Sequence, residues 1–414
     1  MKIALIAERV GPLPAPATDA YPGDPADRVV ALARALGGLG QKVTIYARRD
    51  DAGLPDRFAL CPGVTIERIS AGPASRLPAD QLLGQLAPFG GLLADRWQRS
   101  APVVVHAHFW TSGLAALVGA RDLDLPVVQT FRSLADRSLA ADLQGDHGPQ
   151  RSDGRQPPGP PAPPARIRLE TAIGRSARAV LASTSAEFAA LVRRGVPQAS
   201  VTVVPSGVDT TRFRPSGPVA SRARRPRLLV VAPLDQQQGL VTVLQALTHL
   251  PEAELVIAGG PPQAQLPGDP GYQRLTRLAE RLGLRGRLTC TGRVSQAGMP
   301  ALLRSADVLV SVTAAEPFDL VPLEAMACGV PVIAAAGSQQ DAVIDEVTGF
   351  LVPAMKPVVL ASRVGQLLAR PMLAEGYGIA AASRARDRYS WERIGKETLA
   401  AYERMLALRA RAAA

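Results

Sequence analysis

Short apolar runs alternate along the chain with stretches whose apolar residues recur at helical spacing. In the first half the runs lie at 2–7, 42–48, 102–109, 126–131, 179–184 and 201–206. In the second half they lie at 227–233, 254–260, 287–292, 308–313, 331–336 and 349–352. Runs of this length predict strands that are buried on both faces, and the stretches between them predict crossover helices. The pattern therefore predicts two α/β domains, each a doubly wound, Rossmann-like parallel sheet. Because ligands bind at the carboxyl ends of such strands, we expect the two domains to face each other across a cleft at those ends.

Two segments interrupt this alternation and divide the chain. Residues 136–164 are rich in proline and bury almost nothing, which predicts a mobile loop in the first domain. Residues 207–226 are predicted to link a first domain over 1–206 to a second domain over 227–390. The chain closes with a helix over 391–414, which we expect to pack back on the first domain. One face of this helix carries Trp391, Ile394, Leu399, Tyr402, Met405 and Leu406.

The net charge of +11 comes almost entirely from arginine, since the only lysines are Lys2, Lys42, Lys356 and Lys396. One interpretation is an anionic partner, such as a phosphorylated ligand, nucleic acid or an acidic membrane face. The other is a basic surface without a specific partner, which the scatter of the arginines favours. No nucleic-acid-binding motif is present, so no nucleic-acid partner is expected. No basic amphipathic helix stands out, so peripheral membrane contact has little support.

The cysteines and the first residues favour a reducing compartment. Cys61, Cys290 and Cys328 are odd in number and far apart, which is typical of buried free thiols and not of a disulfide frame or a zinc site. The first residues lead directly into a predicted strand and lack a signal-peptide pattern. No apolar run reaches the roughly 18 residues that a membrane-spanning helix needs. We therefore expect a cytoplasmic protein.

The strongest local signal is the segment 316–331, which reads EPFDLVPLEAMACGVP. Pro322 is suited to the first helical position, where its missing N–H costs nothing. Glu324 then falls in the first turn, eight residues after Glu316 in the preceding loop. The free N–H groups of a first turn can meet phosphate, while a carboxylate there can hold sugar or ribose hydroxyls. Taken alone, Glu324 is equally typical of an ordinary helix start.

The whole segment resembles the E-x7-E signature of the retaining glycosyltransferases of family 4, which have the GT-B fold. Further segments resemble the same family in order and spacing, and they lie at 106–117, 201–215, 257–262, 288–295, 348–353 and 388–394. The resemblance covers nearly the full chain, and it is closest to actinobacterial members such as the N-acetylglucosaminyltransferase of mycothiol biosynthesis. It implies transfer of a sugar from a nucleoside diphosphate sugar to a small-molecule or lipid-linked acceptor, with retention of configuration. It also implies that no metal or other cofactor is needed.

The resemblance assigns expected roles to individual residues. Glu316 is expected to contact the transferred sugar as a catalytic residue, and Glu324 to bind the ribose of the donor. Arg293 and Val294 are expected beside the base. Backbone amides from Phe318 to Leu320 are expected to approach the diphosphate. Such amides stabilise the departing phosphate charge, which is the main catalytic demand when no metal helps.

Several donor-side positions depart from the family pattern. The family carries an Arg and a Lys that clamp the diphosphate, and here Pro233 and Gln238 stand in their place, while Gly239 is kept. The Gly that follows Phe318 in the family pattern is replaced by Asp319, which brings a carboxylate toward the donor phosphate. A glycine pair near the donor is reduced to Gly23. Because one lost oxyanion donor costs about 2.7–4 kcal/mol, these changes weigh heavily on ordinary donor use.

A further departure lies on the acceptor side, where Arg132 occupies the position of a family histidine near the reaction centre. Arg132, Arg225 or Arg293 are candidates to restore the missing positive charge in the cleft. Three interpretations therefore stay open. The chain is an active glycosyltransferase, a catalytically impaired homologue that acts as a binding or partner protein, or a GT-B enzyme with other chemistry such as sugar-nucleotide epimerisation.

Other candidate residues lie near the predicted strand ends of the first domain. His108, Trp110 and Ser133 are expected on the acceptor side, although a core role explains them equally well. We interpret His106 and His108 as pointing to opposite faces of their strand, so that they form no metal pair. The D-x-D sequence at 122–124 matches a metal motif of other glycosyltransferases, but its position predicts an exposed turn. No metal site is therefore expected.

Overall fold

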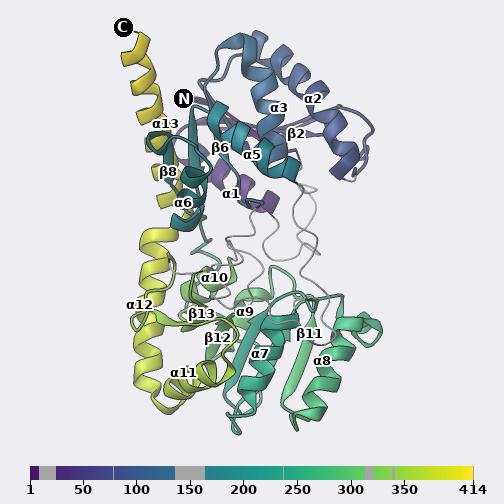
Figure 1. Ribbon diagram of the computed structural model, residues 1–414, viewed down its shortest axis with the longest axis vertical. Coiled ribbons are helices and arrows are strands. Elements are labelled where there is room, and N and C mark those ends of the chain that lie inside the picture. The colour runs from purple at the N-terminus through teal and green to yellow at the C-terminus, as the bar shows by residue number, and fades with distance from the viewer. Residues whose placement is uncertain are drawn as a thin grey trace.

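In a computed structural model the chain forms two α/β lobes stacked along its long axis (Figure 1). The structure describes residues 1–8, 25–77, 79–135, 164–235, 237–312, 320–337 and 341–413. We call the part that contains β1 to β8 the first lobe and the part that contains β9 to β14 the second lobe. The alternation of strands and helices predicted from the apolar runs is confirmed in both.

The first lobe is built on a sheet whose described strands follow the order β3-β4-β2-β1-β5-β6-β7-β8. All neighbours pair in parallel except β3 and β4, which form an antiparallel edge. The order runs outward from β1 in both directions, which is the doubly wound arrangement. The strands are β1 Lys2–Ile6, β2 Lys42–Arg48, β3 Arg57–Cys61, β4 Val64–Ile69, β5 Val104–His108, β6 Val127–Thr130, β7 Ala179–Ala182 and β8 Val201–Val203. The helices are α1 Pro25–Gly38, α2 Ala79–Arg99, α3 Trp110–Ala120, α5 Pro164–Ser176 and α6 Ser185–Arg193, with short 3-10 turns η1 Arg121–Leu123 and η2 Gln198–Ser200.

The second lobe is built on a sheet whose described strands are all parallel, in the order β11-β10-β9-β12-β13-β14. The strands are β9 Arg227–Val231, β10 Glu254–Ala258, β11 Leu288–Gly292, β12 Val308–Ser311, β13 Val332–Ala335 and β14 Gly349–Val352. The helices are α7 Gln237–Leu247, α8 Pro270–Arg281, α9 Met299–Arg304, α10 Val321–Ala327, α11 Pro357–Ala369 and α12 Pro371–Tyr389, with a 3-10 segment η3 Gln263–Gly268. Helix α13 Trp391–Ala413 follows α12. In each lobe, apolar cores cover both faces of the sheet, as continuous apolar strands require.

Strands β3 and β4 and helix α2 of the first lobe were not predicted from the sequence. Strand β3 is the edge strand and is only partly buried, so it lacks a continuous apolar run. Helix α2 contains Pro88 and several glycines, which weaken the helical pattern. Gly90 belongs there because a Cβ at that position would lie 2.7 Å from the Val118 side chain of α3, so the two helices pack closely.

Helix α13 leaves the second lobe and runs along the first (Figure 1). Its residues Ile394, Tyr402 and Met405 belong to the apolar core of the first lobe, and Trp391, Leu399 and Leu406 pack against that core. The prediction that the last helix packs back on the first domain is therefore confirmed, with the apolar face that the sequence indicated.

Two hydrogen bonds show how the lobes face each other. Gln296, which follows β11, donates from Nε2 to Asp27 Oδ2 at the start of α1, at a distance of 2.6 Å. The backbone N–H of Ser185, which follows β7, donates to Asp341 Oδ2, which follows β13, also at 2.6 Å. All four residues come after the carboxyl ends of strands. The carboxyl edges of the two sheets therefore meet, which is where ligands bind in open α/β sheets.

Among the helices that the structure describes, none combines the length and the apolar character needed to cross a bilayer.

Candidate functional site

Two neighbouring strands of the first lobe end in strained residues. Phe109 follows β5 and has φ 69°, ψ 153°, a region that is almost restricted to glycine. Arg132 follows β6 by two residues and has φ 67°. Such conformations cost about 1–3 kcal/mol each and persist only where the surroundings hold them. Because they cluster at functional sites, these paired strand ends are a candidate site from geometry alone.

Arg132 is folded inward at this edge and is 7% exposed. Its Nη1 donates to Ser206 Oγ at 2.8 Å, and its Nη2 lies 3.5 Å from His108 Nδ1. Burial, followed by the nearby charge of Arg28, lowers the pKa of Arg132 to about 9, so it stays a cation at neutral pH. The guanidinium is thus held between two strand ends and the segment that leaves β8. Arg132 therefore lies at the strand ends, where its guanidinium is engaged by Ser206 and His108.

The contact with Arg132 fixes which nitrogen of His108 carries the proton. A guanidinium can only donate, so Nδ1 accepts and the imidazole carries its proton on Nε2. That Nε2 is buried and has no hydrogen-bond partner among the residues the structure describes. Burial, then the neighbouring His106 and Arg132, lowers the pKa of His108 well below its ordinary value, so the ring is neutral.

His106 lies on the same face as His108, with ring centroids 4.2 Å apart. The prediction of opposite faces was wrong, because side chains two residues apart on a strand point to the same side. His106 is fully satisfied: its Nδ1 lies 2.6 Å from Tyr402 Oη on α13, and its Nε2 lies 2.9 Å from Thr130 Oγ1. Burial and Arg132 lower its pKa to about 3. His106 therefore ties the crossover helix to the strand ends.

These groups line a small cavity between the strand ends and α13. Its volume is about 10 Å³, which is close to the space that one water centre requires. Its lining combines the polar cluster with apolar residues of α1, β7, α13 and the segment after β8. The lining residues are Leu32, His106, His108, Thr130, Arg132, Leu181, Val204, Pro205, Trp391, Ile394 and Thr398. The cavity is too small for a sugar, so it is not itself a sugar-binding pocket.

Glu187 is a second buried charge close to Arg132 that sequence reasoning missed. Its Oε2 accepts from the Ser183 backbone N–H at 2.5 Å, while its own N–H donates to Thr184 Oγ1 at 3.0 Å. Burial raises the pKa of Glu187 to about 7, against the hydrogen bond from Ser183 and the charge of Arg132. The capping-box pattern, in which Glu follows Thr by three residues, was the available signal.

The predicted acceptor-side residues Trp110 and Ser133 lie near one cation that was not predicted. The guanidinium of Arg166 on α5 lies 5.9 Å from the centroid of the Trp110 ring, and its Nη2 donates to the Ser133 carbonyl at 3.2 Å. Its Nε donates to Glu170 Oε1 at 2.8 Å. Arg166 keeps 32% of its side chain exposed. The structure thus brings Trp110 and Ser133 together around an accessible arginine.

The predicted donor-side residues that the structure describes share the carboxyl edge of the second sheet. Pro233 and Gly239 follow β9, Arg293 and Val294 follow β11, and Leu320 and Glu324 follow β12. Glu324 lies in the first turn of α10 as predicted and is 8% exposed. Arg293 is exposed and its backbone N–H donates to the Pro261 carbonyl at 3.0 Å. Outside the described residues lie Glu316, Phe318, Asp319, Gly23, the loop before residue 164, and the side chain of Gln238.

Arg225 does not belong to this edge. It lies just before β9 and donates from Nη1 to the Pro251 carbonyl, which precedes β10, at 3.0 Å. Both residues are at the amino ends of the strands, opposite to the ligand edge. The hypothesis that Arg225 replaces a missing clamp charge is therefore wrong.

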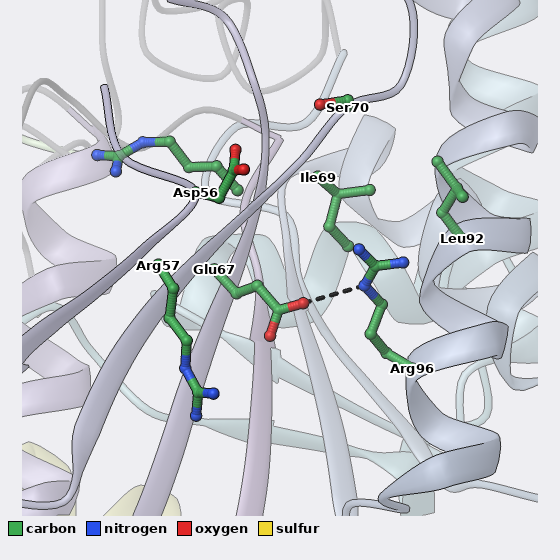
Figure 2. Close-up of a pocket in the computed structure, with 8 residues that line it drawn as sticks. Asp56, Arg57, Glu67, Ile69, Ser70, Leu92 and Arg96 are labelled. Atoms are coloured by element: carbon green, nitrogen blue, oxygen red, sulfur yellow. Dashed lines mark hydrogen bonds and ion pairs between the residues drawn. The ribbon is translucent and has the colours of Figure 1, made fainter. Parts of the chain in front are cut away.

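A separate cavity of about 320 Å³ lies at the β3 edge of the first sheet (Figure 2). Glu67 and Arg96, which line it, form an ion pair at 3.0 Å, and Asp56 pairs with Arg49. Its charged groups thus largely compensate one another. Ile69 and Ser70, which also line it, lie at the carboxyl end of β4.

No group of three or more His, Cys, Asp or Glu within the described ranges is arranged to hold a metal ion. The D-x-D segment at 122–124 forms a short 3-10 turn, and Asp124 makes an ion pair with Arg409 of α13. The prediction of a turn at this position is confirmed.

Comparison with known proteins adds family information to this geometry. Residues 216–384 match the family model "Glycosyl transferases group 1". Residues 23–207 match the model "Glycosyl transferase 4-like domain". The first match covers the described strands of the second sheet. The second match covers the described strands of the first sheet from β2 onward.

Individual relatives extend over nearly the whole chain. A D-inositol 3-phosphate glycosyltransferase of Xylanimonas cellulosilytica is 33% identical over 97% of this chain and 96% of its own length. The solved sucrose-phosphate synthase of Thermosynechococcus elongatus is 28% identical with a TM-score of 0.79, covering 98% of this chain and 99% of that one. HepE of Anabaena, solved in complex with UDP, has a TM-score of 0.70 at 18% identity, over 96% of this chain and 98% of that one.

Proposed function

We propose, because this chain belongs to the group 1 glycosyltransferases, that it transfers a sugar from a nucleoside diphosphate sugar to a small acceptor. Membership confirms the resemblance drawn from the segment 316–331, and the likeness to sucrose-phosphate synthase confirms the GT-B fold. In this proposal the donor nucleotide binds the second domain, over 227–390, and the acceptor binds the first, over 1–206. Residues 207–226 link the two, and the helix over 391–414 crosses between them.

The observation that carries this proposal is the meeting of the two carboxyl edges. The bonds from Gln296 to Asp27 and from Ser185 to Asp341 bring strand ends of both sheets within reach of one ligand. On one side lies the buried carboxylate of Glu324, and on the other lies the strained turn at Arg132. A group-transfer enzyme needs its two substrates held against each other, and facing strand ends provide that arrangement.

The donor-side roles belong to the proposal. Glu324 binds the ribose, Arg293 and Val294 flank the base, and backbone amides up to Leu320 meet the diphosphate. Glu316 contacts the transferred sugar, with retention of its configuration and without a metal ion. The family resemblance of the segment that contains both glutamates supports these roles. The free thiols of Cys61, Cys290 and Cys328 support a cytoplasmic site of action.

For the acceptor we propose a small phosphorylated polyol. The curated relative of Xylanimonas cellulosilytica is named for D-inositol 3-phosphate. In this chain the Arg166 Nη1 makes no hydrogen bond to any described residue, and the guanidinium is partly exposed beside Trp110 and Ser133. A guanidinium is well suited to bind a phosphate.

The test offers UDP-, GDP- and ADP-sugars together with D-inositol 3-phosphate and detects the glycosylated product by mass spectrometry. We expect turnover with one donor, and we expect Glu316→Ala to stop it. The control is Glu280→Ala, a change at an exposed residue on α8, which should leave turnover intact. The proposal fails if the purified protein binds no nucleoside diphosphate at millimolar concentration.

One observation favours a second candidate, a catalytically impaired homologue that binds a ligand or a partner. Pro233 stands where the family has a clamp arginine, and Arg132 is held by Ser206 and His108 instead of facing a diphosphate. The impaired homologue is distinguished by nucleotide binding without turnover in the same assay. An epimerase is distinguished by a donor that changes in the absence of any acceptor.

A further inference from the structure

The segment after β6 is fixed by a single buried carboxylate on another element. Glu170 lies on α5 and is 0% exposed. Its two oxygens accept from the Ala135 backbone N–H, at 2.9 Å for Oε2 and 3.2 Å for Oε1. Oε1 also accepts from Arg166 Nε at 2.8 Å, and Oε2 accepts from Arg194 Nη1 at 2.9 Å. One side chain thus joins α5, the end of α6 and the turn after β6.

Arg166 and Arg194 also donate to backbone carbonyls of the same turn. Arg194 donates from Nη2 to the Ala135 carbonyl at 2.8 Å, so that residue is held through both its N–H and its C=O. Arg166 donates from Nη2 to the Ser133 carbonyl at 3.2 Å. Arg166 also lies against the ring of Trp110, the first residue of α3. The arrangement therefore connects the ends of β5 and β6.

The chemistry of this position requires an ionised carboxylate. A buried carboxylate is costly unless charges and hydrogen bonds compensate it, and here two guanidinium groups and one amide do so. A neutral amide of the same shape would leave two cations close together. It would also direct an N–H₂ group toward one of them. The interaction is thus sensitive to the loss of charge alone.

The turn that is held in this way contains the strained residue of the site. Arg132 at φ 67° keeps its conformation only if its surroundings determine it. Its side chain is held by Ser206 on one side, and the backbone three residues later is held by Glu170 and Arg194 on the other. Release of one end allows the turn to relax and moves Ser133 and the guanidinium of Arg166.

We infer that Glu170 is a positioning residue for the acceptor: it fixes the turn 132–135 and orients Arg166 beside Trp110. This inference rests on the proposed function, because the turn is the acceptor side of that site. Glu170 itself is fully buried and acts through the residues it holds. Loss of its charge should weaken use of the acceptor and leave donor binding unchanged.

The test compares wild type with Glu170→Gln and with the matched control Glu254→Gln. Glu254 accepts from Arg227 Nε at 2.8 Å in a similarly buried pair, but at the amino ends of the second sheet. We expect Glu170→Gln to raise hydrogen exchange in the peptide that contains 131–135 by at least about 10-fold. With D-inositol 3-phosphate as the varied substrate, kcat/KM should fall by about 100-fold, while the KM for the sugar nucleotide stays unchanged. Glu254→Gln should show neither effect.

Unchanged exchange in the turn, or equal losses for donor and acceptor, overturns the inference. If Glu170→Gln does not fold, Arg194→Gln replaces it, since that variant keeps the carboxylate and removes the bonds of the Arg194 guanidinium to Glu170 and to the Ala135 carbonyl. If wild type shows no turnover with any donor, the proposed function fails, and the exchange measurement alone decides whether Glu170 fixes the turn.

Discussion

Glu187 is expected to make the stability of the protein depend on pH between the values at which its carboxyl titrates in the unfolded and folded states. The side chain is 1% exposed at the start of α6, and its Oε1 has no hydrogen-bond partner among the described residues. Burial raises the pKa of Glu187 from 4.5 to about 7. The perturbation that isolates this group is Glu187→Gln, which keeps the shape of the side chain and cannot ionise.

The sign follows from proton linkage. Between pH 4.5 and about 7 the folded chain holds a proton on Glu187 that the unfolded chain has released. The resulting stabilisation is fully present below pH 4.5 and is lost as the pH rises through about 7. At 1.36 kcal/mol for each pH unit, this interval corresponds to about 3 kcal/mol in the free energy of unfolding. Such an amount is a large part of the stability of a typical domain.

The assay is urea unfolding of wild type and Glu187→Gln from pH 4.5 to pH 8, followed by tryptophan fluorescence. Trp97 and Trp110 both lie on helices of the first lobe and report on it. From pH 4.5 to pH 8, wild type should lose about 3 kcal/mol relative to the variant. His106 and His108 titrate in both proteins, so their contributions cancel in the difference. A difference that stays constant across this range would refute the reasoning, because it would mean that the buried carboxyl titrates normally.

Two further predictions concern the second lobe. Gly259→Ala should lower the free energy of unfolding by roughly 3 kcal/mol, because Gly259 has φ 144° and a Cβ there would lie 2.1 Å from the Ala232 carbonyl oxygen. Gly268→Ala is the control in the same denaturation experiment. Its Cβ would meet nothing within 4 Å, so it should change the free energy of unfolding by less than about 0.5 kcal/mol. Pro233→Arg combined with Gln238→Lys should raise the affinity for UDP about 10-fold or more, because charged hydrogen bonds to the diphosphate contribute about 1.5–3 kcal/mol each. The affinity is measured by calorimetry, with uridine as the control ligand that should show no gain. An unchanged UDP affinity would contradict the clamp assignment.

The parallel strands and the crossover helix could be predicted because their signal is local. Each buried strand reads as a continuous apolar run, and α13 carries its apolar face at regular spacing. The edge strand β3 and helix α2 could not be predicted in the same way. Strand β3 buries little, and the glycines of α2 serve a close approach to α3 that only the folded chain reveals.

The candidate site was predictable only where a motif or a strand end indicated it. Glu324 lies where the sequence placed it, in the first turn of the helix that follows β12. Trp110, which was expected near a strand end, is the first residue of α3. The role of Glu170 could not be predicted, because only Arg166 lies near it in the chain, whereas Arg194 and Ala135 lie 24 and 35 residues away. The inward direction of Arg132 depends in the same way on Ser206, which is 74 residues later. Side chains that act through tertiary contacts leave no local pattern.

The proposed acceptor side shows why the position of a charge matters more than the number of charges. Near the turn after β6, the guanidinium groups of Arg132, Arg166 and Arg194 face the carboxyls of Glu170 and Glu187. Arg132 is 7% exposed and already bonded to Ser206, and Arg194 keeps only 10% of its side chain exposed beside Glu170. Arg166 is 32% exposed and retains a nitrogen that bonds to no described residue. If the acceptor binds at this turn as proposed, an anionic group on it meets Arg166 first, and Arg132 acts as a buried support instead of a second phosphate ligand.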